Sequence, residues 1–117
     1  MTAGRTFLGY RRPGGRAGVR NHVLILSPTG LTSAAATRVA SLVHGTICVT
    51  SGYGRGQVGA DAKLQFDTLV GLAANPNVAA TLVLAAGPDI VKSYVDAIAA
   101  SGKPVKGLSL PTPMRMR

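Results

Sequence analysis

Four short runs of apolar and β-branched residues divide the chain, and their spacing constrains the fold more than any other feature. The runs cover residues 22–27, 46–50, 78–86 and 105–110. The first run is nearly continuous, which is typical of a strand buried on both faces. The last run alternates, which predicts an edge strand with one face in water.

The segments between these runs carry helical periodicity. Apolar residues recur at helical spacing over 31–43, and a second helix is expected after Asp61, which can cap it, with Leu64 among its inward-facing residues. The clearest apolar stripe covers 90–98, and Pro88 is well suited to the first turn of that helix. Three helices therefore alternate with four strands.

The order βαβαβαβ predicts an α/β fold with an open, mostly parallel four-stranded sheet and three layers. Each crossover between parallel strands needs a long connection, and the helices provide it. We expect a flavodoxin-like or Rossmann-like arrangement with strand order 2-1-3-4. The domain should cover residues 21–110, after a basic glycine- and arginine-rich arm over 1–20 and before a flexible tail over 111–117.

The charge of the chain is strongly positive. Its 117 residues include 13 Lys and Arg against 4 Asp and Glu, which gives a net charge of +9. This imbalance predicts an anionic partner, either an acidic small molecule, an acidic subunit or nucleic acid. The scarcity of aromatic residues and the lack of a basic recognition helix argue against nucleic acid. Five arginines lie in the arm: Arg5, Arg11, Arg12, Arg16 and Arg20.

Cysteine usage and hydropathy predict a cytoplasmic protein. Cys48 is the only cysteine, so an intrachain disulfide is excluded and a reducing compartment is the simplest interpretation. The first residues lack the apolar centre of a secretory signal, and no apolar run approaches membrane-spanning length. His22 and His44 are isolated, and no metal-ligand spacing or catalytic triad is visible.

A glycine-rich loop follows the second predicted strand. Residues Gly54 to Gly59 fit the pattern G-x-G-x-x-G between a strand and a helix, where backbone N–H groups can approach a phosphate. Two features weaken a dinucleotide site: the first glycine lies late after the strand, and Ala85-Ala86-Gly87 at the end of the next strand offers no acid for a ribose. A tight structural turn and a site for another anion both remain open.

Arginines before the first strand extend this candidate site. Arg16 and Arg20 can form bidentate hydrogen bonds to a carboxylate or phosphate, although a solvated basic arm also explains their charge. They start at the amino edge of the sheet, whereas the glycine-rich loop lies at the carboxyl edge. A shared site therefore requires the arm to fold back or a neighbouring chain to supply it. The predicted site for an acidic ligand comprises Arg16, Arg20, Asn21, Tyr53, Arg55 and Gln57.

Several short blocks agree with one known family in sequence, order and spacing. The blocks are Phe7–Pro13 (FLGYRRP), Gly15–Asn21 (GRAGVRN), Gly54–Gln57 (GRGQ) and Asn75–Val78 (NPNV). From about Phe7 to Leu110 the chain resembles the N-terminal domain of the large catalytic region in the altronate/galactarate dehydratase (UxaA) family. That family includes the large subunit of sulfolactate sulfo-lyase.

The resemblance implies a lyase that eliminates water or sulfite from acidic hydroxy compounds, with iron(II) as the cofactor of the sugar-acid dehydratases. The chain departs from the family at two places that the resemblance assigns to the active site. Arg55 replaces a cysteine in the family's Gly-Cys-Gly-Gln loop, and Gly87-Pro88-Asp89 stands where the family has Gly-Cys-Glu. Losing these cysteines removes soft metal ligands, so we expect no cofactor in this chain itself.

Family members continue for a few hundred residues more, so this chain is expected to be a fragment, a split subunit or a diverged relative without activity of its own. Its expected partners are an acidic small-molecule ligand and either further copies of itself or a missing catalytic or SAF-domain subunit. No catalytic residue can be named from the sequence. The alternative function is a non-catalytic module that binds anions or nucleic acid.

Overall fold

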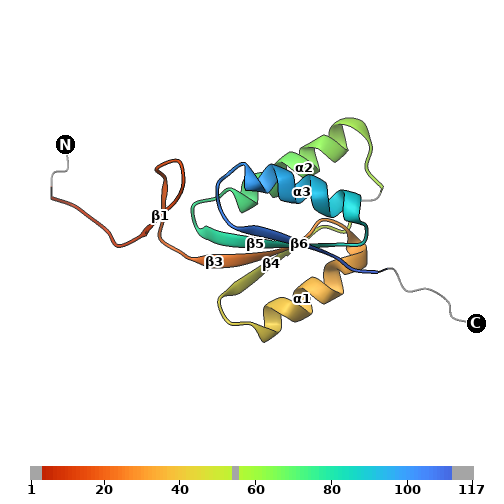
Figure 1. Ribbon diagram of the computed structural model, residues 1–117, viewed down its shortest axis with the longest axis horizontal. Coiled ribbons are helices and arrows are strands. Elements are labelled where there is room, and N and C mark those ends of the chain that lie inside the picture. The colour runs from red at the N-terminus through yellow and green to blue at the C-terminus, as the bar shows by residue number, and fades with distance from the viewer. Residues whose placement is uncertain (1–3, 54–55, 112–117) are drawn as a thin grey trace, which may run out of the picture.

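A computed structural model, which describes residues 4–53 and 56–111, contains an open sheet of four parallel strands (Figure 1). The strands are β3 (His22–Ser27), β4 (Thr46–Thr50), β5 (Val78–Ala85) and β6 (Val105–Ser109). They lie in the order β4-β3-β5-β6, and every neighbouring pair is parallel. Counted along the chain this is the order 2-1-3-4, which confirms the predicted α/β fold class and sheet.

Helices cover both faces of this sheet and give the predicted three layers. The short 3-10 turn η1 (Gly30–Thr32) leads into α1 (Ser33–Leu42) on one face, and α2 (Gly59–Ala73) and α3 (Pro88–Ala99) lie on the other face (Figure 1). Pro88 starts α3 as expected, because its fixed φ suits a helix start and its missing N–H would have no partner there. No helix in the described part of the chain is long and apolar enough to cross a membrane.

Side chains of β3 alternate between two hydrophobic clusters, one on each face of the sheet. Leu24 and Leu26 pack in the cluster that includes Leu69 of α2. Ile25 packs in the other cluster, against Ala36 of α1. Because helices cover both faces, every side chain in the middle of β3 is buried, which explains its continuous apolar sequence.

The start of α2 differs from the sequence prediction. The helix begins at Gly59, so Asp61 lies within its first turn, and Val58 takes the capping position without a side-chain hydrogen bond. The prediction that Asp61 caps the helix was wrong because the chain turns into the helix two residues earlier. Leu64 is 67% exposed and does not face inward. It lies about 200° around the helix axis from Phe66, which belongs to the true inward stripe of Phe66, Leu69, Val70 and Ala73.

The arm contains a short hairpin that was not predicted from the sequence. Its strands are β1 (Tyr10–Arg11) and β2 (Ala17–Gly18), which pair antiparallel. The hairpin lies beyond the start of β3, at the amino edge of the sheet (Figure 1). Gly18 is buried there, and a Cβ at this position would lie 2.1 Å from the carbonyl oxygen of Pro76. The predicted tail lies outside the described residues, apart from its first residue.

Candidate functional site

The structure places the residues of the predicted site at opposite edges of the sheet. Arg16, Arg20 and Asn21 precede β3 and lie at its amino edge, whereas Tyr53 and Gln57 follow β4 and lie beyond its carboxyl edge. Strands of this length separate the two groups by about 17–20 Å. Arg55 lies outside the described residues. The described chain therefore offers two separate groups of candidate residues.

At the amino edge, hydrogen bonds fix the arm to the loop between α2 and β5. Arg12 Nε donates to the carbonyl oxygen of Pro76 at 2.7 Å, and Arg12 Nη2 donates to Asn21 Oδ1 at 2.9 Å. Asn77 Oδ1 accepts hydrogen bonds from the backbone N–H groups of residues 19 and 20 at 2.9 and 3.1 Å. Asn21, predicted to bind a ligand, thus holds Arg12 in place.

Lys103 adds a buried positive charge to this edge. Its Nζ donates to the carbonyl oxygens of Asn75 at 2.7 Å and Val78 at 2.9 Å, and the residue is only 6% exposed. Burial lowers the pKa of Lys103, and the nearby guanidinium groups of Arg12 and Arg16 lower it further. No local pattern in the sequence singles out this lysine, because its burial depends on the loop that folds over it.

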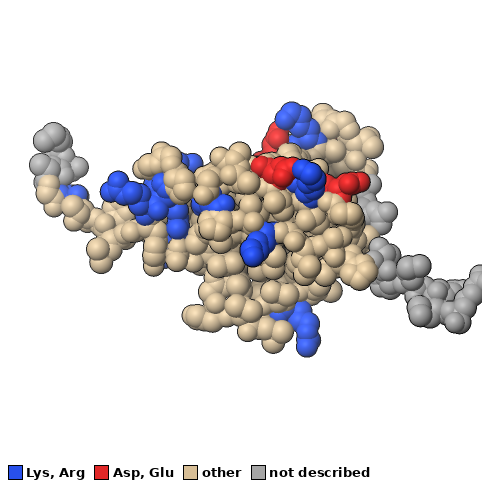
Figure 2. Space-filling model, viewed as in Figure 1, with Lys and Arg blue, Asp and Glu red and all other residues tan. Residues whose placement is uncertain are grey.

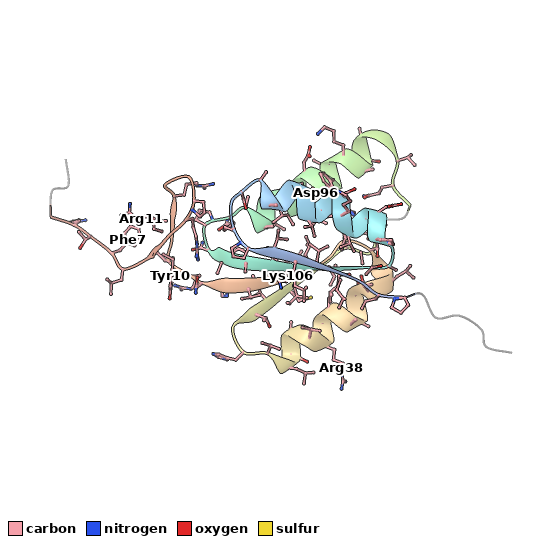
Figure 3. All side chains as sticks on the ribbon, viewed as in Figure 1. Phe7, Tyr10, Arg11, Arg38, Asp96 and Lys106 are labelled. Carbon is pink, nitrogen blue, oxygen red and sulfur yellow. The ribbon has the colours of Figure 1, made fainter. Side chains whose placement is uncertain are left out.

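The surface charge is unevenly distributed. Figure 2 shows Lys and Arg gathered over the arm end of the molecule, while the acidic residues lie over α2 and α3. Figure 3 places Arg11 on the arm and Arg38 apart from it on α1. Arg16 and Arg20 are exposed residues at this basic end, and Arg20 Nη1 donates to the carbonyl oxygen of Val19 at 3.3 Å.

At the carboxyl edge, a single side chain connects the loops that follow β3 and β4. Ser51 Oγ donates to Gln65 Oε1 at 2.8 Å, and Gln65 Nε2 donates to the carbonyl oxygen of Pro28 at 3.1 Å. Tyr53 is 77% exposed, and its backbone N–H lies 3.4 Å from Ser51 Oγ. The Tyr53 side chain therefore stands at the rim of this edge.

A cavity of about 230 Å³ opens between α2, α3 and the loop after β3. Two buried oxygens that belong to residues of its wall, Thr29 Oγ1 and Gln57 Oε1, have no hydrogen-bond partner among the described residues. The cavity lies beyond β3 and β5, where the strand order reverses and where open α/β sheets collect ligands. Its lining residues are Pro28, Thr29, Gln57, Ala62, Gln65, Phe66, Ile90, Ser93 and Tyr94.

The backbone around Thr29 is held firmly by neighbouring hydroxyl groups. The carbonyl oxygen of Thr29 accepts hydrogen bonds from Ser27 Oγ at 2.9 Å and Ser33 Oγ at 3.3 Å. Thr32 Oγ1 lies 2.7 Å from Ser27 Oγ and donates to the carbonyl oxygen of Leu84 at 2.8 Å. This buried network joins the ends of β3 and β5, so the Thr29 hydroxyl belongs to an ordered wall.

Aromatic rings form another wall of the cavity. The rings of Phe66 and Tyr94 lie 4.7 Å apart between centroids, tilted by 52°. Burial raises the pKa of the Tyr94 phenol, while a hydrogen bond with Gln65 acts in the opposite direction. The phenol is therefore neutral at pH 7, and none of the lining side chains carries a charge.

Sequence comparison assigns the chain to a family. Residues 9–113 match the family described as D-galactarate dehydratase/Altronate hydrolase, second domain. The chain belongs to this family. It is also 51% identical over 104 residues to the (2R)-sulfolactate sulfo-lyase subunit beta of Chromohalobacter salexigens. This alignment covers 89% of the chain but only 27% of that relative. No solved structure was found to be similar.

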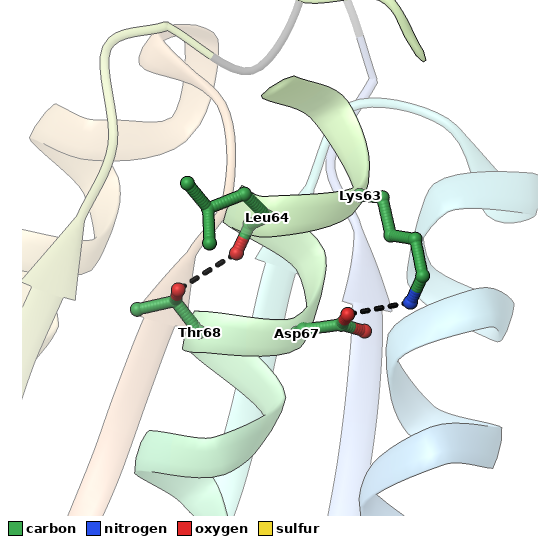
Figure 4. A network of polar contacts seen from close by, with 4 residues as sticks. All are labelled: Lys63, Leu64, Asp67 and Thr68. Atoms are coloured by element: carbon green, nitrogen blue, oxygen red, sulfur yellow. Dashed lines mark hydrogen bonds and ion pairs between the residues drawn. The ribbon is translucent and has the colours of Figure 1, made fainter. Parts of the chain in front are cut away.

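The carboxylates of this galactarate dehydratase/altronate hydrolase domain are dispersed over helix surfaces. Asp67 pairs with Lys63 at 2.6 Å, beside the bond from Thr68 to the carbonyl oxygen of Leu64 (Figure 4). Asp96 pairs with Lys92 in the same i,i+4 manner on α3. Within residues 4–53 and 56–111, no three His, Cys, Asp or Glu residues gather as metal ligands. These side chains do not fit an iron(II) site.

Most residues of the cavity wall were absent from the predicted site, because they come from segments far apart in the sequence. Only Gln57 was predicted, through its place within the glycine-rich loop. A usable signal was present at Pro28-Thr29-Gly30, which stops the first strand and so lies at the carboxyl edge. The contribution of α3, through Ser93 and Tyr94, required the folded structure.

Proposed function

We propose that this chain is the part of a lyase that binds an acidic hydroxy compound, and that further polypeptide completes the chemistry. The observation that carries the proposal is the extent of the family match: nearly the whole chain aligns, yet it spans about a quarter of the relative. We further propose that it corresponds to the opening domain of the large catalytic region of such enzymes. A cytoplasmic location fits this role and stays a prediction.

The proposed acid-binding site lies at the carboxyl edge, where Tyr53, Arg55 and Gln57 precede α2. The capping residue Val58 gives the helix no side-chain acceptor, so the first N–H groups of α2 are available to a negative group. Arg55 adds positive charge to this loop. Its guanidinium group can make two parallel hydrogen bonds to a carboxylate.

A partner subunit is the second part of the proposal. The relative is named as a subunit of its enzyme, and we propose that an analogous partner supplies the iron ligands and general base. Arg16, Arg20 and Asn21 at the opposite edge would then face this partner rather than the acid.

Calorimetric titration with galactarate and with sulfate tests the acid site. Arg55→Ala should weaken binding by about 1.5–3 kcal/mol if the charged hydrogen bond is shielded from water. Arg16→Ala plus Arg20→Ala should leave affinity nearly unchanged, because both residues lie at the other edge. Arg38→Ala is the control for the single variant, and Arg38→Ala plus Lys106→Ala is the control for the double variant. Each control removes the same charge as its test variant from exposed positions elsewhere (Figure 3). Unchanged binding by Arg55→Ala would refute the site.

A non-catalytic nucleic-acid-binding module is the alternative, and the basic amino edge is the observation that favours it. Filter binding to duplex and single-stranded DNA at two salt concentrations separates the two functions. A nucleic-acid binder should lose affinity steeply with salt, with a log–log slope of about −0.9 per phosphate contact on duplex DNA. Tight binding that Arg16→Ala plus Arg20→Ala abolishes would reverse our preference.

A further inference from the structure

The cavity between α2 and α3 contains hydrogen-bonding capacity that the described chain leaves unused. Thr29 is 4% exposed, yet its Oγ1 has no partner among the described residues, and the same holds for Gln57 Oε1. Burying a polar atom without a partner destabilises a fold, so such atoms are rare in native proteins. Two of them on residues that line one cavity indicate a ligand that bonds to both.

Loose packing does not explain the unused hydroxyl. The backbone of Thr29 is fixed by Ser27 and Ser33, and the adjoining wall is fixed by the bonds of Gln65 to Ser51 and Pro28. The backbone of this wall is therefore fixed before a ligand arrives, as expected of a binding pocket.

Size and charge define the ligand. About 230 Å³ greatly exceeds the roughly 10–15 Å³ that one water molecule needs, and is somewhat smaller than the roughly 300–1,000 Å³ of pockets for drug-sized molecules. No lining side chain is charged, so a carboxylate inside would remain unpaired at high energetic cost. The pocket suits a ligand with a short, uncharged carbon chain. Hydroxyl groups on that chain would form hydrogen bonds with Thr29 and Gln57, and its C–H groups would contact Phe66 and Ile90.

We propose that this cavity binds the hydroxylated carbon chain of the acid, while its carboxylates stay outside, one of them at the start of α2. Thr29 and Gln57 would distinguish a polyhydroxy acid from a plain acid of equal length and charge. The proposal rests on the proposed function for its choice of an acid, but the cavity can be tested with a neutral polyol alone.

The experiment compares three six-carbon probes by backbone amide shifts of the ¹⁵N-labelled full chain. Galactarate carries both carboxylates and hydroxyls, adipate carries only the carboxylates, and galactitol carries only hydroxyls. Galactitol should shift the amides of Thr29, Ser93 and Tyr94, and galactarate should bind more tightly than adipate. Thr29→Val, which replaces the hydroxyl by a methyl group of similar size, should weaken galactarate by about 2- to 10-fold and leave adipate unchanged.

Thr37→Val is the matched control, because Thr37 is exposed on α1 at the other face of the sheet. The cavity site would be overturned if galactitol shifted none of these amides and galactarate bound no more tightly than adipate. If adipate and sulfate fail to bind while galactitol still shifts the cavity amides, the acid site is wrong and the cavity site stands.

A second readout needs no ligand. Because the Thr29 hydroxyl lacks a partner among the described residues, Thr29→Val should leave the melting temperature unchanged or raise it, the opposite of what removing a structural hydrogen bond would do. A clear fall in melting temperature, without loss of galactarate affinity, would show that the hydroxyl only holds a structural water and would refute the proposal.

Discussion

Gly18 shows how one residue fixes the position of the arm. Its Cα passes so close to the α2–β5 loop that a Cβ would lie 2.1 Å from the Pro76 carbonyl oxygen and 3.0 Å from the Asn77 nitrogen. Both contacts are with backbone atoms, which cannot move aside as the end of a flexible side chain can. A close approach of two backbones, rather than a special φ, therefore requires glycine here.

Gly18→Ala should lower the free energy of unfolding by about 1–3 kcal/mol, as overpacking does. The same change at Gly71 should act in the opposite direction, because this exposed glycine lies inside α2 and a Cβ there would have no neighbour within 4 Å among the described residues. Gly71→Ala should stabilise by roughly 0.5–1 kcal/mol through helix propensity. Urea unfolding measures both, and equal effects would contradict the close contact at Gly18.

Lys103 links stability to pH at a single side chain. Its pKa in the folded protein lies below the ordinary value of 10.5, chiefly because of burial. The unfolded state therefore binds this proton more tightly than the folded state. Between the folded and unfolded pKa values, the free energy of unfolding contributed by Lys103 rises with pH, and below the folded pKa its penalty is fully present and constant.

We expect the unfolding free energy of the wild type, relative to Lys103→Met, to rise as the pH approaches 10.5. The difference isolates Lys103 from other groups that titrate in this range. Lys106→Met, which removes an exposed charge from β6, is the control and shows whether general charge effects suffice. Urea unfolding midpoints at three pH values between neutrality and about 10 give this difference in unfolding free energy. If stability changes with pH in the same way for wild type and Lys103→Met, the lowered pKa of Lys103 is contradicted.

At the scale of elements, periodicity predicted the sheet but not the hairpin. Strands β3 and β4 have the predicted bounds, whereas β5 and β6 each end one residue earlier than predicted. The strands of the hairpin have two residues each, too short for any alternation to appear. The turn signal Pro13-Gly14-Gly15 between them is local and visible, but the contacts with the distant α2–β5 loop are not.

Asn77→Ala should release the hairpin while the sheet persists. Asn77 Oδ1 accepts two hydrogen bonds from the arm, and alanine leaves both N–H groups without their acceptor. Hydrogen exchange followed by mass spectrometry should show faster exchange over residues 10–20 and unchanged exchange over β5. If exchange in the arm stays as slow as in the wild type, Asn77 is not the attachment point.

At the scale of the whole molecule, the sequence predicted a loop at the carboxyl edge but not the cavity beside it. The loop from β4 to α2 was predicted because glycine spacing is local and visible. The cavity was not, because Thr29, Phe66 and Tyr94 meet only after three segments pack together. Arg16 and Arg20 were expected at the amino edge because they precede the first strand, and a site shared with the glycine-rich loop required the arm to fold back or a neighbouring chain to supply it. In the described residues the arm is held against the α2–β5 loop at the amino edge instead.

The chain alone should not turn over altronate, galactarate or sulfolactate, even with added iron(II). The described residues provide no cluster of metal ligands, and the two described pairs of Asp and Lys are on helix surfaces. The assay follows keto-acid formation and sulfite release by the purified chain. Turnover above the rate of the buffer would show that the chemistry needs no further polypeptide.

The separation of the two edges has an evolutionary consequence. Residues that anchor the arm and residues that line the cavity share no side chain, and the strands between them are ordinary core. Substitutions at one edge can therefore accumulate without disturbing the other. The attachment of the arm and the lining of the cavity can therefore diverge independently.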